Sequence, residues 1–524
     1  MKKLLVKKDS YFDSVFLMLM SRELKTTPGV VDAIVAMGTD MNLELLGSMG
    51  FAAEEMAGAG PNDLLIAVDC AEPQAMERAL EAAKQVLGKK KAPAGAGALS
   101  APATLAAAVE RVPGTNLAVI SLPGAYAVRE ARKALELGLH VMLFSDNVPL
   151  EDEIALKALS REKGLLMMGP DCGTAIINGK PLCFANIVRR GPVGVVGASG
   201  TGIQEVTCLV DRAQCGISQA IGTGGRDLKN AKVGGSTMLM AIEALAQDED
   251  TNVIVVISKP PAKAQAEQVV AALEQAGKPA VVHFIGLAPE PRAGSVVHFA
   301  TNLEETAGMA VALAEGQPYK PRMFTLADAE IEAILEVETK GILSGQKYLR
   351  GYYTGGTLAD EAWILLHQLT GAVHSNNQTD PAFVPADPHK SIGHTVVDLG
   401  DDTFTVGRPH PMIDPSTRTE RIMAELEDPE IAVVIVDVVL GYGSHEDPAG
   451  ALAPALAALK AAARKRGGYL PVLASITGTR SDYQNFAAQK ATLEAAGCVV
   501  LPSNYQASML AVKLLEKVQK RGAK

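Results

Sequence analysis

Two runs of almost uninterrupted apolar residues constrain the fold of this chain most strongly. Residues 253–258 read VIVVIS, and residues 432–438 read AVVIVDV. Runs of this kind are typical of strands buried on both faces of a parallel sheet, because a strand with one wet face would alternate polar and apolar residues. Parallel neighbours need crossover connections, which are usually helices. The chain is therefore expected to form α/β domains with doubly wound parallel sheets.

The same alternation of short apolar runs and helical patterns divides the 524 residues into four blocks. Residues 1–90 predict a small βαβ unit. Residues 106–190 predict a Rossmann-like domain, and residues 191–320 and 325–524 predict two further α/β domains. The segment KKKAPAGAGALSAPA predicts a linker after the first block, and EGQPYKPR marks a boundary before the last. The runs predicted as strands are 3–6, 30–37, 64–68, 117–121, 140–144, 165–168, 193–196, 253–258, 278–284, 432–438, 470–475 and 498–501. The clearest predicted helices are 73–87, 127–137, 151–163 and 451–464.

Composition excludes several classes of function. The net charge of −10 argues against nucleic acid as a main partner, because binding phosphate backbones needs a basic surface. The six cysteines form no CxxC pair, and no histidine pair has a metal-binding spacing, so we expect reduced thiols and no metal. Asp9 and Asp13 interrupt the apolar N-terminus, which favours a strand and a helix over a signal peptide. No run of about 18 apolar residues could span a membrane, and we expect a cytosolic protein.

The segment GVVGASGTGIQE at residues 194–205 is the most informative one. A buried strand ends there in a turn of small residues, and a helix begins with Ser199 as a natural N-cap. The amides of Gly200, Thr201 and Gly202 would be free in the first turn, where the helix dipole favours an anion. Such turns also occur for packing alone, and the pattern by itself does not choose between the two.

Three more glycine-rich turns occur along the chain. One contains Gly355, Gly356 and Thr357, and another, after the run 432–438, contains Gly443, Ser444 and His445. Repetition of the turn at the carboxyl ends of strands favours phosphate binding, because ligands of open α/β sheets bind at that edge. The remaining turn carries Gly224, Gly225 and Arg226. Its arginine could clamp a carboxylate or simply lie at the surface.

Histidines give weaker signals. His445 lies in a glycine-rich turn where proton transfer is conceivable, and His410 lies in the proline-rich loop GRPHPMIDPSTR. His283 and His298 sit in apolar stretches, where a histidine of the core is the simpler interpretation. The sequence has no GxxxxGK[ST] phosphate loop, and no GxGxxG follows a first strand.

Several motifs in order carry a family resemblance. GPDCGT, GPVGVVGASGTGIQE and IGTGGRDL resemble the α subunit of succinyl-CoA synthetase, and residues 116–174 resemble the second half of its CoA-binding domain. YYTGGTLADEA, VVDLGDDTF and DPEIAVVIVDVVLGYGSHED are similar to the ligase domain of the β subunit. With the opening YFDSVFLMLMSRELKTTPGVVDAIVAMGTDMNLELL, this order resembles the FdrA family over nearly the whole chain. The resemblance implies a half CoA-binding domain and two flavodoxin-like ligase domains.

The chain departs from a complete synthetase in three ways. No segment is left to form an ATP-grasp domain, and the first half of the CoA domain is replaced. The region APEPRAGSVVHFATNL lacks the family's GHAG histidine, which carries phosphate between sites. Glu205 matches the family glutamate that orients this histidine. The chain is therefore not expected to be a complete nucleotide-driven ligase, and we expect no bound cofactor.

The resemblance implies a subunit of an oxamate carbamoyltransferase, which cleaves oxalurate with phosphate to give oxamate and carbamoyl phosphate. The expected partners are these small molecules and other subunits of the same complex. The alternatives are an acyl-CoA synthetase that borrows its ATP-grasp function from another chain, and a non-catalytic scaffold subunit. The residues predicted for phosphate are Ser199, Gly200, Thr201, Gly202, Gly443 and Ser444. Those predicted for the substrate are Gly224, Gly225, Arg226, Gly355, Gly356, Thr357 and Arg408. Glu205 and His445 are predicted to be catalytic.

Overall fold

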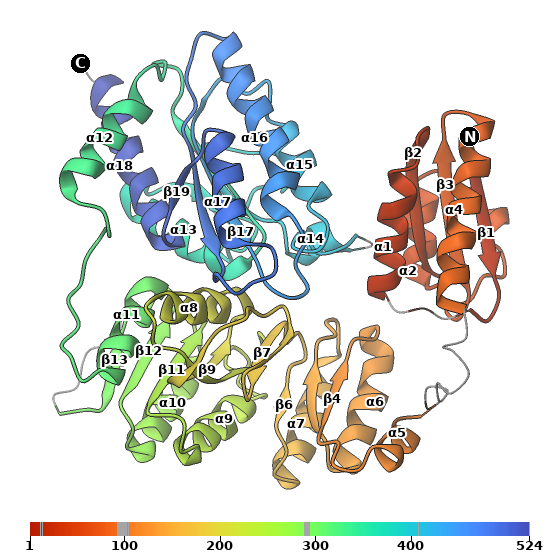
Figure 1. The fold of residues 1–524 in the computed structure, drawn as a ribbon, viewed down its shortest axis with the longest axis horizontal. Helices are drawn as coiled ribbons and strands as arrows, with labels where there is room; N and C mark the ends of the chain where they lie inside the picture. Colours follow the sequence, from red (N-terminus) through yellow and green to blue (C-terminus); the bar gives the residue numbers. More distant parts are fainter. Residues whose placement is uncertain are drawn as a thin grey trace. The chain divides into compact units, whose positions relative to one another are not determined.

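The computed structural model describes residues 1–10, 12, 14–91, 102, 104–287, 294–406 and 408–522. The chain forms two compact units, one of residues 1–115 with 407–409, and one of residues 116–406 with 410–524 (Figure 1). Most of the predicted linker lies outside the described residues, as does part of the region that lacks the GHAG motif. Among the described helices, none is long and apolar enough to cross a membrane.

The first unit contains a small three-stranded sheet with the order β1-β3-β2. Its elements are β1 (Lys2–Lys7), α1 (Ser14–Lys25), β2 (Val30–Met37), α2 (Asp40–Ser48), α3 (Ala53–Met56), β3 (Leu64–Cys70), α4 (Pro73–Lys91) and α5 (Leu105–Arg111). Strand β3 lies antiparallel between β1 and β2, so β1 and β2 run in the same direction. This is the split form of the predicted βαβ unit, with a strand inserted between its two parallel strands.

The second unit begins with a three-stranded parallel sheet, β4-β5-β6. Its elements are β4 (Leu117–Ile120), α6 (Gly124–Glu136), β5 (His140–Leu143), α7 (Leu150–Glu162) and β6 (Met167–Met168). Helices α6 and α7 pack against each other beside this sheet. A parallel sheet with helical crossovers is what the sequence predicts for this block.

A seven-stranded sheet follows, with the order β13-β12-β11-β9-β10-β7-β8. Its elements are β7 (Thr174–Ile177), β8 (Lys180–Cys183), β9 (Arg190–Ala198), α8 (Gly200–Arg212), β10 (Ile217–Gly222), α9 (Ser236–Gln247), β11 (Val253–Ser258), α10 (Lys263–Ala276), β12 (Ala280–Phe284), β13 (Val297–Phe299) and α11 (Leu303–Ala314). The hairpin β7–β8 joins antiparallel at one edge, so this sheet takes in residues that precede the predicted boundary at 190.

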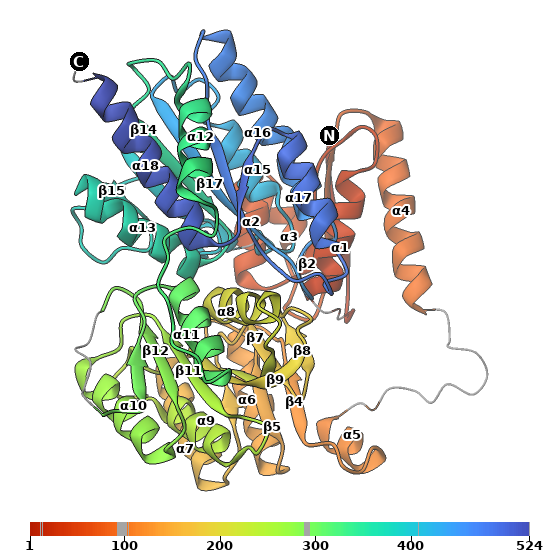
Figure 2. The same cartoon turned by 60° about the vertical axis from the view of Figure 1, so that its left-hand side comes forward.

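A six-stranded parallel sheet completes the unit, with the order β15-β16-β14-β17-β18-β19. Figure 2 labels β14, β15 and β17 of this sheet. Its elements are α12 (Asp328–Thr339), β14 (Tyr348–Tyr353), α13 (Gly356–Thr370), β15 (Val373–His374), β16 (His394–Asp398), α14 (Asp402–Thr405), α15 (Ser416–Met423), β17 (Ile431–Val439), α16 (Pro448–Lys465), β18 (Val472–Thr477), α17 (Phe486–Ala495), β19 (Val499–Leu501) and α18 (Asn504–Gly522).

The two large sheets repeat one topology. Five parallel strands of the first run in the order β10-β9-β11-β12-β13, and five of the second run β16-β14-β17-β18-β19. Numbered along the chain, both orders are 2-1-3-4-5, which is the flavodoxin-like arrangement. The connections reverse direction between β9 and β11, and again between β14 and β17. In sheets of this type ligands bind at the carboxyl ends of the strands at such a point.

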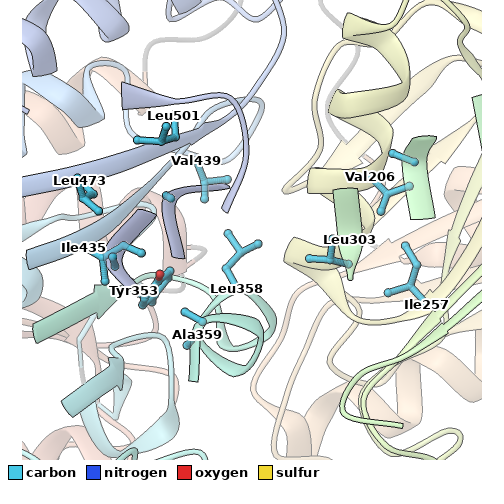
Figure 3. Packing of buried hydrophobic residues seen from close by; sticks show 14 of the residues in the cluster. Val206, Ile257, Leu303, Tyr353, Leu358, Ala359, Ile435, Val439, Leu473 and Leu501 are labelled. Atoms are coloured by element: carbon cyan, nitrogen blue, oxygen red, sulfur yellow. The ribbon is translucent and has the colours of Figure 1, made fainter. Parts of the chain in front are cut away.

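Four helices form the layer between the two sheets. Helices α8 and α11 cover one face of the first sheet, α13 and α18 cover one face of the second, and the two pairs pack together. A single buried apolar cluster continues across this layer. Figure 3 shows Val206, Ile257 and Leu303 of the first half opposite Leu358 and Ala359 of the second.

Two buried glutamates, one from each half, accept hydrogen bonds from the other half across this interface. Glu205 on α8 accepts the amide of Asn504, the first residue of α18, at 3.1 Å. Glu361 on α13 accepts the amide of Leu303, the first residue of α11, at 2.8 Å. Each half therefore supplies a carboxylate to the N-terminus of the last helix of the other half, where a helix favours an anion.

Asn504 joins the two glutamates into one network. Its amide nitrogen Nδ2 donates to a carboxylate oxygen of Glu361 at 2.7 Å and to the carbonyl of Leu358 at 3.0 Å. Desolvation raises the pKa of Glu205, and it raises that of Glu361 to about 7, although the hydrogen bonds act in the opposite direction. The network is therefore close to the limit at which buried carboxylates remain ionised at neutral pH.

Replacing Asn504 by alanine should destabilise the second unit, because it removes the donor to one buried carboxylate oxygen of Glu361. The expected loss is about 3 kcal/mol, the cost of unsatisfied buried groups next to a charge. Urea unfolding can be followed by the fluorescence of Trp363, the single tryptophan, which lies on α13. Asn252→Ala, at an exposed position, should change the unfolding free energy by less than about 0.5 kcal/mol. Equal midpoints for both variants would contradict a stabilising role for the network.

Candidate functional site

The N-termini of α8 and α13 meet face to face. Ser199 caps α8, and its Oγ accepts the amide of Gly202 at 3.2 Å. The same Oγ lies 2.6 Å from Oγ1 of Thr357, in the first turn of α13. Thr201, at the matching position of α8, packs against Gly355, the N-cap of α13. The structure therefore brings together two of the glycine-rich turns that the sequence identifies.

The close approach of these helix ends explains the glycine at position 355. A Cβ there would lie 2.3 Å from Cγ2 and 2.6 Å from Oγ1 of Thr201. The hydroxyl-bearing residues between the ends are buried, whereas Gly200 and Gly356, the first residues of the two helices, remain partly exposed. The first amides of a helix have no acceptor inside that helix. An anion could reach the pair of helix ends at these two glycines.

A matched pair of substitutions tests this packing. Gly355→Ala should lower the unfolding free energy by about 2 kcal/mol, because the new methyl group overlaps a packed threonine. Gly200→Ala should change it by less than about 0.5 kcal/mol, since the added Cβ meets only Oγ1 of Thr174, at 3.4 Å. Denaturant unfolding of both variants gives the comparison. A Gly355→Ala protein as stable as Gly200→Ala would show that the ends are not in contact.

A buried ion pair fixes the turn that begins α13. Asp437 on β17 accepts the amide of Thr354 at 3.0 Å and its hydroxyl at 2.8 Å. Arg418 donates to Oδ1 of Asp437 at 2.9 Å, and all three residues are almost fully buried. Because Asp437 accepts both the backbone amide and the hydroxyl of Thr354, the turn is rigid. Gly355 and Gly356 are therefore held in one backbone geometry.

Charged side chains converge on the first residue of α13. A Cβ on Gly356 would lie 2.6 Å from Oδ2 of Asp398, 3.1 Å from Nδ2 of Asn377 and 3.2 Å from Nζ of Lys259. Lys259 also forms an ion pair of 3.1 Å with Asp360. Desolvation lowers the pKa of Lys259, but Asp360, Asp398 and Asp171 outweigh it, so that the pKa is raised and the lysine stays charged. Sequence reasoning missed this cluster.

Two carboxyl groups of the cluster titrate near neutral pH. Desolvation raises the pKa of Asp398, which ends β16, to about 6. It raises the pKa of Asp171 to about 7, and the negative charges of Asp146 and Asp402 act in the same direction. Asp171 lies in the GPDCGT motif. Its side chain reaches solvent, but the protein around it still reduces its hydration, which raises its pKa. Perturbed acids of this kind are typical of functional sites.

His410 lies beside Asp398. A Cβ on Gly400 would lie 2.6 Å from Nε2 of His410 and 3.2 Å from Oδ1 of Asp398. The Nδ1 atom of His410 accepts the amide of Met412 at 3.2 Å, so the proton of the neutral ring is on Nε2. Desolvation lowers its pKa to about 4. The histidine is therefore neutral at pH 7 and is a hydrogen-bond donor at this edge of the site.

The turn of Gly443, Ser444 and His445, which is similar in sequence to that of Ser199, does not begin a helix. After β17 the chain runs through a loop, and α16 begins only at Pro448 with Asp447 as its N-cap. Gly443 and Ser444 are therefore not at a helix N-terminus. The loop packs on residues 183–185 instead, with the amide of Tyr442 bonded to the carbonyl of Ala185 at 2.8 Å. The Nδ1 atom of His445 accepts the amide of Asp447 in its own turn.

The catalytic role predicted for Glu205 is also corrected. Its carboxylate accepts hydrogen bonds from Thr477 and from the amide of Asn504, both in the second half. Only 1% of its surface is exposed. Glu205 therefore belongs to the interface network between the two halves.

The turn of Gly224, Gly225 and Arg226 lies next to the loop that carries Asp171. Gly224 packs against the carbonyl of Pro170, and a Cβ on Gly225 would lie 3.5 Å from Oδ2 of Asp171. Arg226 is anchored on α7 by an ion pair of 2.8 Å with Glu153, and it donates to the carbonyl of Val148 at 2.7 Å. Its guanidinium therefore already has partners. Arg408 falls in the segment that clusters with the first unit, and its predicted contact with the substrate stays a prediction.

The six cysteines are all free thiols, as predicted. In the described part of the chain, no group of three histidine, cysteine or acidic side chains could hold a metal ion. Residues 1–115 contain one cysteine, Cys70, and no histidine. Cys70 is buried, and desolvation raises its pKa, so its thiol stays protonated. Heavy metals prefer thiolate ligands, and the residues of this unit do not offer a set of them.

Three family models match the chain. The model described as "AllF, heavy metal-associated domain" matches residues 1–102. The CoA binding domain matches residues 188–286, and the CoA-ligase model matches residues 352–514. The last two cover most of the two flavodoxin-like halves. The predicted limits of the CoA-binding-like domain, 106–190, stay a prediction.

Known proteins resemble the chain over different lengths. YahF of Escherichia coli strain K12, described as uncharacterized, is 44% identical over 519 residues, which cover 98% of this chain and 99% of YahF. Subunit alpha 1 of the ADP-forming succinate–CoA ligase of Archaeoglobus fulgidus is 26% identical over 207 residues, which cover 37% of this chain and 69% of that subunit. Among solved structures, the dinucleotide-forming acetyl-coenzyme A synthetase 1 of Ca. Korarchaeum cryptofilum matches with a TM-score of 0.33 and 16% identity, over 79% of this chain and 86% of that one.

Proposed function

Because the chain belongs to the FdrA/AllF-type family of succinyl-CoA synthetase-like proteins, we propose that it is an enzyme subunit that transfers an acyl-type group to or from phosphate. The specific reaction that we propose is the phosphorolysis of oxalurate to oxamate and carbamoyl phosphate. The observation that carries the proposal is the meeting of the α8 and α13 N-termini, with Ser199 and Thr357 in contact and Gly200 and Gly356 open.

The geometry suits a phosphate that takes part in the reaction without a covalent enzyme intermediate. The two helix ends offer free amides and two positive dipole ends to one anion. Lys259 adds a charge beside Gly356. Fixed donors of this kind stabilise charge that develops on a transferred group, so catalysis would rest on positioning and electrostatics.

In the proposed reaction an oxygen of phosphate attacks the terminal ureido carbon of oxalurate. The new C–O bond gives carbamoyl phosphate, and the C–N bond to the oxamate part breaks with its electron pair on nitrogen. That nitrogen takes up one proton and leaves as the amide of oxamate. A group with a pKa near neutrality is suited to supply this proton.

A second candidate is an acyl-CoA synthetase whose nucleotide-binding part is on another chain. The matches to the CoA binding and CoA-ligase models favour it, as does the similarity to succinate–CoA ligase α subunits. In that case the paired helix ends would hold the phosphate of an acyl phosphate before CoA attacks. Both candidates use the same anion site and differ in whether CoA binds.

Calorimetric titration of the purified chain, with any subunits that co-purify, separates the two. Carbamoyl phosphate should bind, and Gly200→Trp should weaken its binding by at least roughly a hundredfold, because the indole fills the open helix end. Gly345→Trp is the control for folding, because Gly345 lies in an exposed turn with open space around it and does not have a positive φ. Tight binding of CoA would favour the synthetase. If neither carbamoyl phosphate nor CoA binds, both candidates fail.

Anion binding should weaken as pH rises. Below about 6 and about 7, respectively, Asp398 and Asp171 are protonated and neutral, and above these values they repel an anion. Sulfate is a suitable probe because its own charge does not change in this range. Its affinity should fall by roughly tenfold between about pH 5 and about pH 8, and Asp171→Asn should flatten the upper part of the curve. An affinity that rises with pH would contradict the proposed position of these carboxyl groups.

A further inference from the structure

We propose that Lys259 and Asp398 together recognise the group acceptor, with Lys259 on the carboxylate of a small oxo acid and Asp398 on its amide N–H. This inference rests on the proposed transfer function and assigns its acceptor site. The two residues come from different halves of the chain and meet over Gly356. Neither was predicted to be a site residue, although Asp398 lies in the VVDLGDDTF motif.

The topology places Lys259 where a ligand is expected. Lys259 directly follows β11, and Ser199 directly follows β9, its parallel neighbour. Ser258 and Ala198, the last residues of these two strands, are partners in the register. The lysine and the cap of α8 therefore stand side by side at the point where the strand order reverses. This is the position at which open α/β sheets bind their ligands.

Lys259 is accessible although its surroundings are mostly buried. Its side chain is 37% exposed, whereas that of its partner Asp360 is 14% exposed. The charged groups that act on it are Asp360 of α13, Asp398 at the end of β16 and Asp171 of the loop before β7. A ligand carboxylate could replace Asp360 on the ammonium group, because Asp360 also has a side-chain hydrogen bond from Asn377. An exchange of this kind leaves no buried charge without a partner.

Asp398 presents one carboxylate oxygen to the same place, and its carboxyl group also has a side-chain hydrogen bond with Asn377. Its Oδ1 accepts the amide of Gly400 at 2.9 Å, which fixes the carboxyl group, and its Oδ2 lies 2.6 Å from the Cβ position of Gly356. An ionised carboxylate is only an acceptor, so Oδ2 selects a ligand atom that carries hydrogen. In an oxo acid with an amide group, the amide nitrogen is such an atom.

The same oxygen can move the proton of the reaction. When carbamoyl phosphate reacts with oxamate, the amide nitrogen bonds to the carbonyl carbon, and the C–O bond breaks with its electron pair on phosphate. The N–H proton passes to Oδ2 of Asp398. In phosphorolysis every step reverses, and protonated Asp398 returns the proton to the leaving nitrogen. Asp398 then touches the reacting atom, whereas Lys259 acts only in binding.

Oxamate and pyruvate form a matched pair of probes, because they have nearly the same shape and charge and only oxamate has an N–H donor. In calorimetry with the full chain and its co-purifying subunits, with and without phosphate, oxamate should bind at least roughly tenfold more tightly than pyruvate. Lys259→Met should weaken both by roughly tenfold or more, and Lys259→Arg should recover part of the affinity. Asp398→Asn should remove the preference for oxamate, because the new amide can donate as well as accept.

Two substitutions at exposed positions are the controls. Lys263→Met, at the start of α10, and Asp328→Asn, at the start of α12, should leave both affinities unchanged. Thermal unfolding of every variant shows whether it is folded. In turnover assays Lys259→Met should raise KM more than it lowers kcat, whereas Asp398→Asn should lower kcat and remove one limb of the pH profile.

The outcomes separate this inference from the proposed function. If Lys259→Met binds oxamate as tightly as the natural chain, or if oxamate and pyruvate bind equally, the recognition pair is wrong. If carbamoyl phosphate binds but neither acid does, the inference fails and the proposed function stands. If carbamoyl phosphate also fails to bind, both are overturned.

Discussion

The contact between two helix ends organises the larger unit of this protein. Helices α8 and α13 begin at equivalent points of two sheets with the same topology, and their first turns touch through Ser199 and Thr357. The positions of the other site residues depend on this contact. It sets the carboxyl edges of both sheets against each other, so that Lys259 of one half reaches Gly356 of the other. The glutamates Glu205 and Glu361, further along the same helices, hold the contact by reciprocal hydrogen bonds.

Much of the fold could be predicted from the sequence, because buried parallel strands leave a strong local signal. The run 253–258 is a strand with the predicted limits, and Ser199 caps α8 as its sequence indicates. The hairpin β7–β8 was not predicted, although Asn178 and Gly179 at its turn both have the positive φ that such turns favour. The Asn-Gly pair is itself the sequence signal for a turn of this kind.

The site itself was predicted only in part, for a physical reason. A glycine-rich turn is visible in the sequence, but whether a helix starts directly after it depends on the length of the loop. The turn of Gly443 therefore looked like that of Ser199, although its helix begins only at Pro448. Lys259 and Asp398 were not predicted to be site residues, although Asp398 lies in the VVDLGDDTF motif, because their roles arise from strand order and from the packing of two halves. Glu205 looked catalytic because only the structure reveals that Asn504 and Thr477 occupy its carboxylate.

The duplicated topology has a consequence for assembly. Because residues 315–347 connect the two halves, each half meets the other at the effective concentration of a tethered pair, which is typically in the millimolar range. Two separate chains would have to overcome the entropy of association with every encounter. A tethered interface can therefore contain weak elements, such as carboxylates close to protonation and small residues without large apolar contacts. Because the two halves are covalently connected, residues between them can be suited to binding a ligand as well as to holding the halves together.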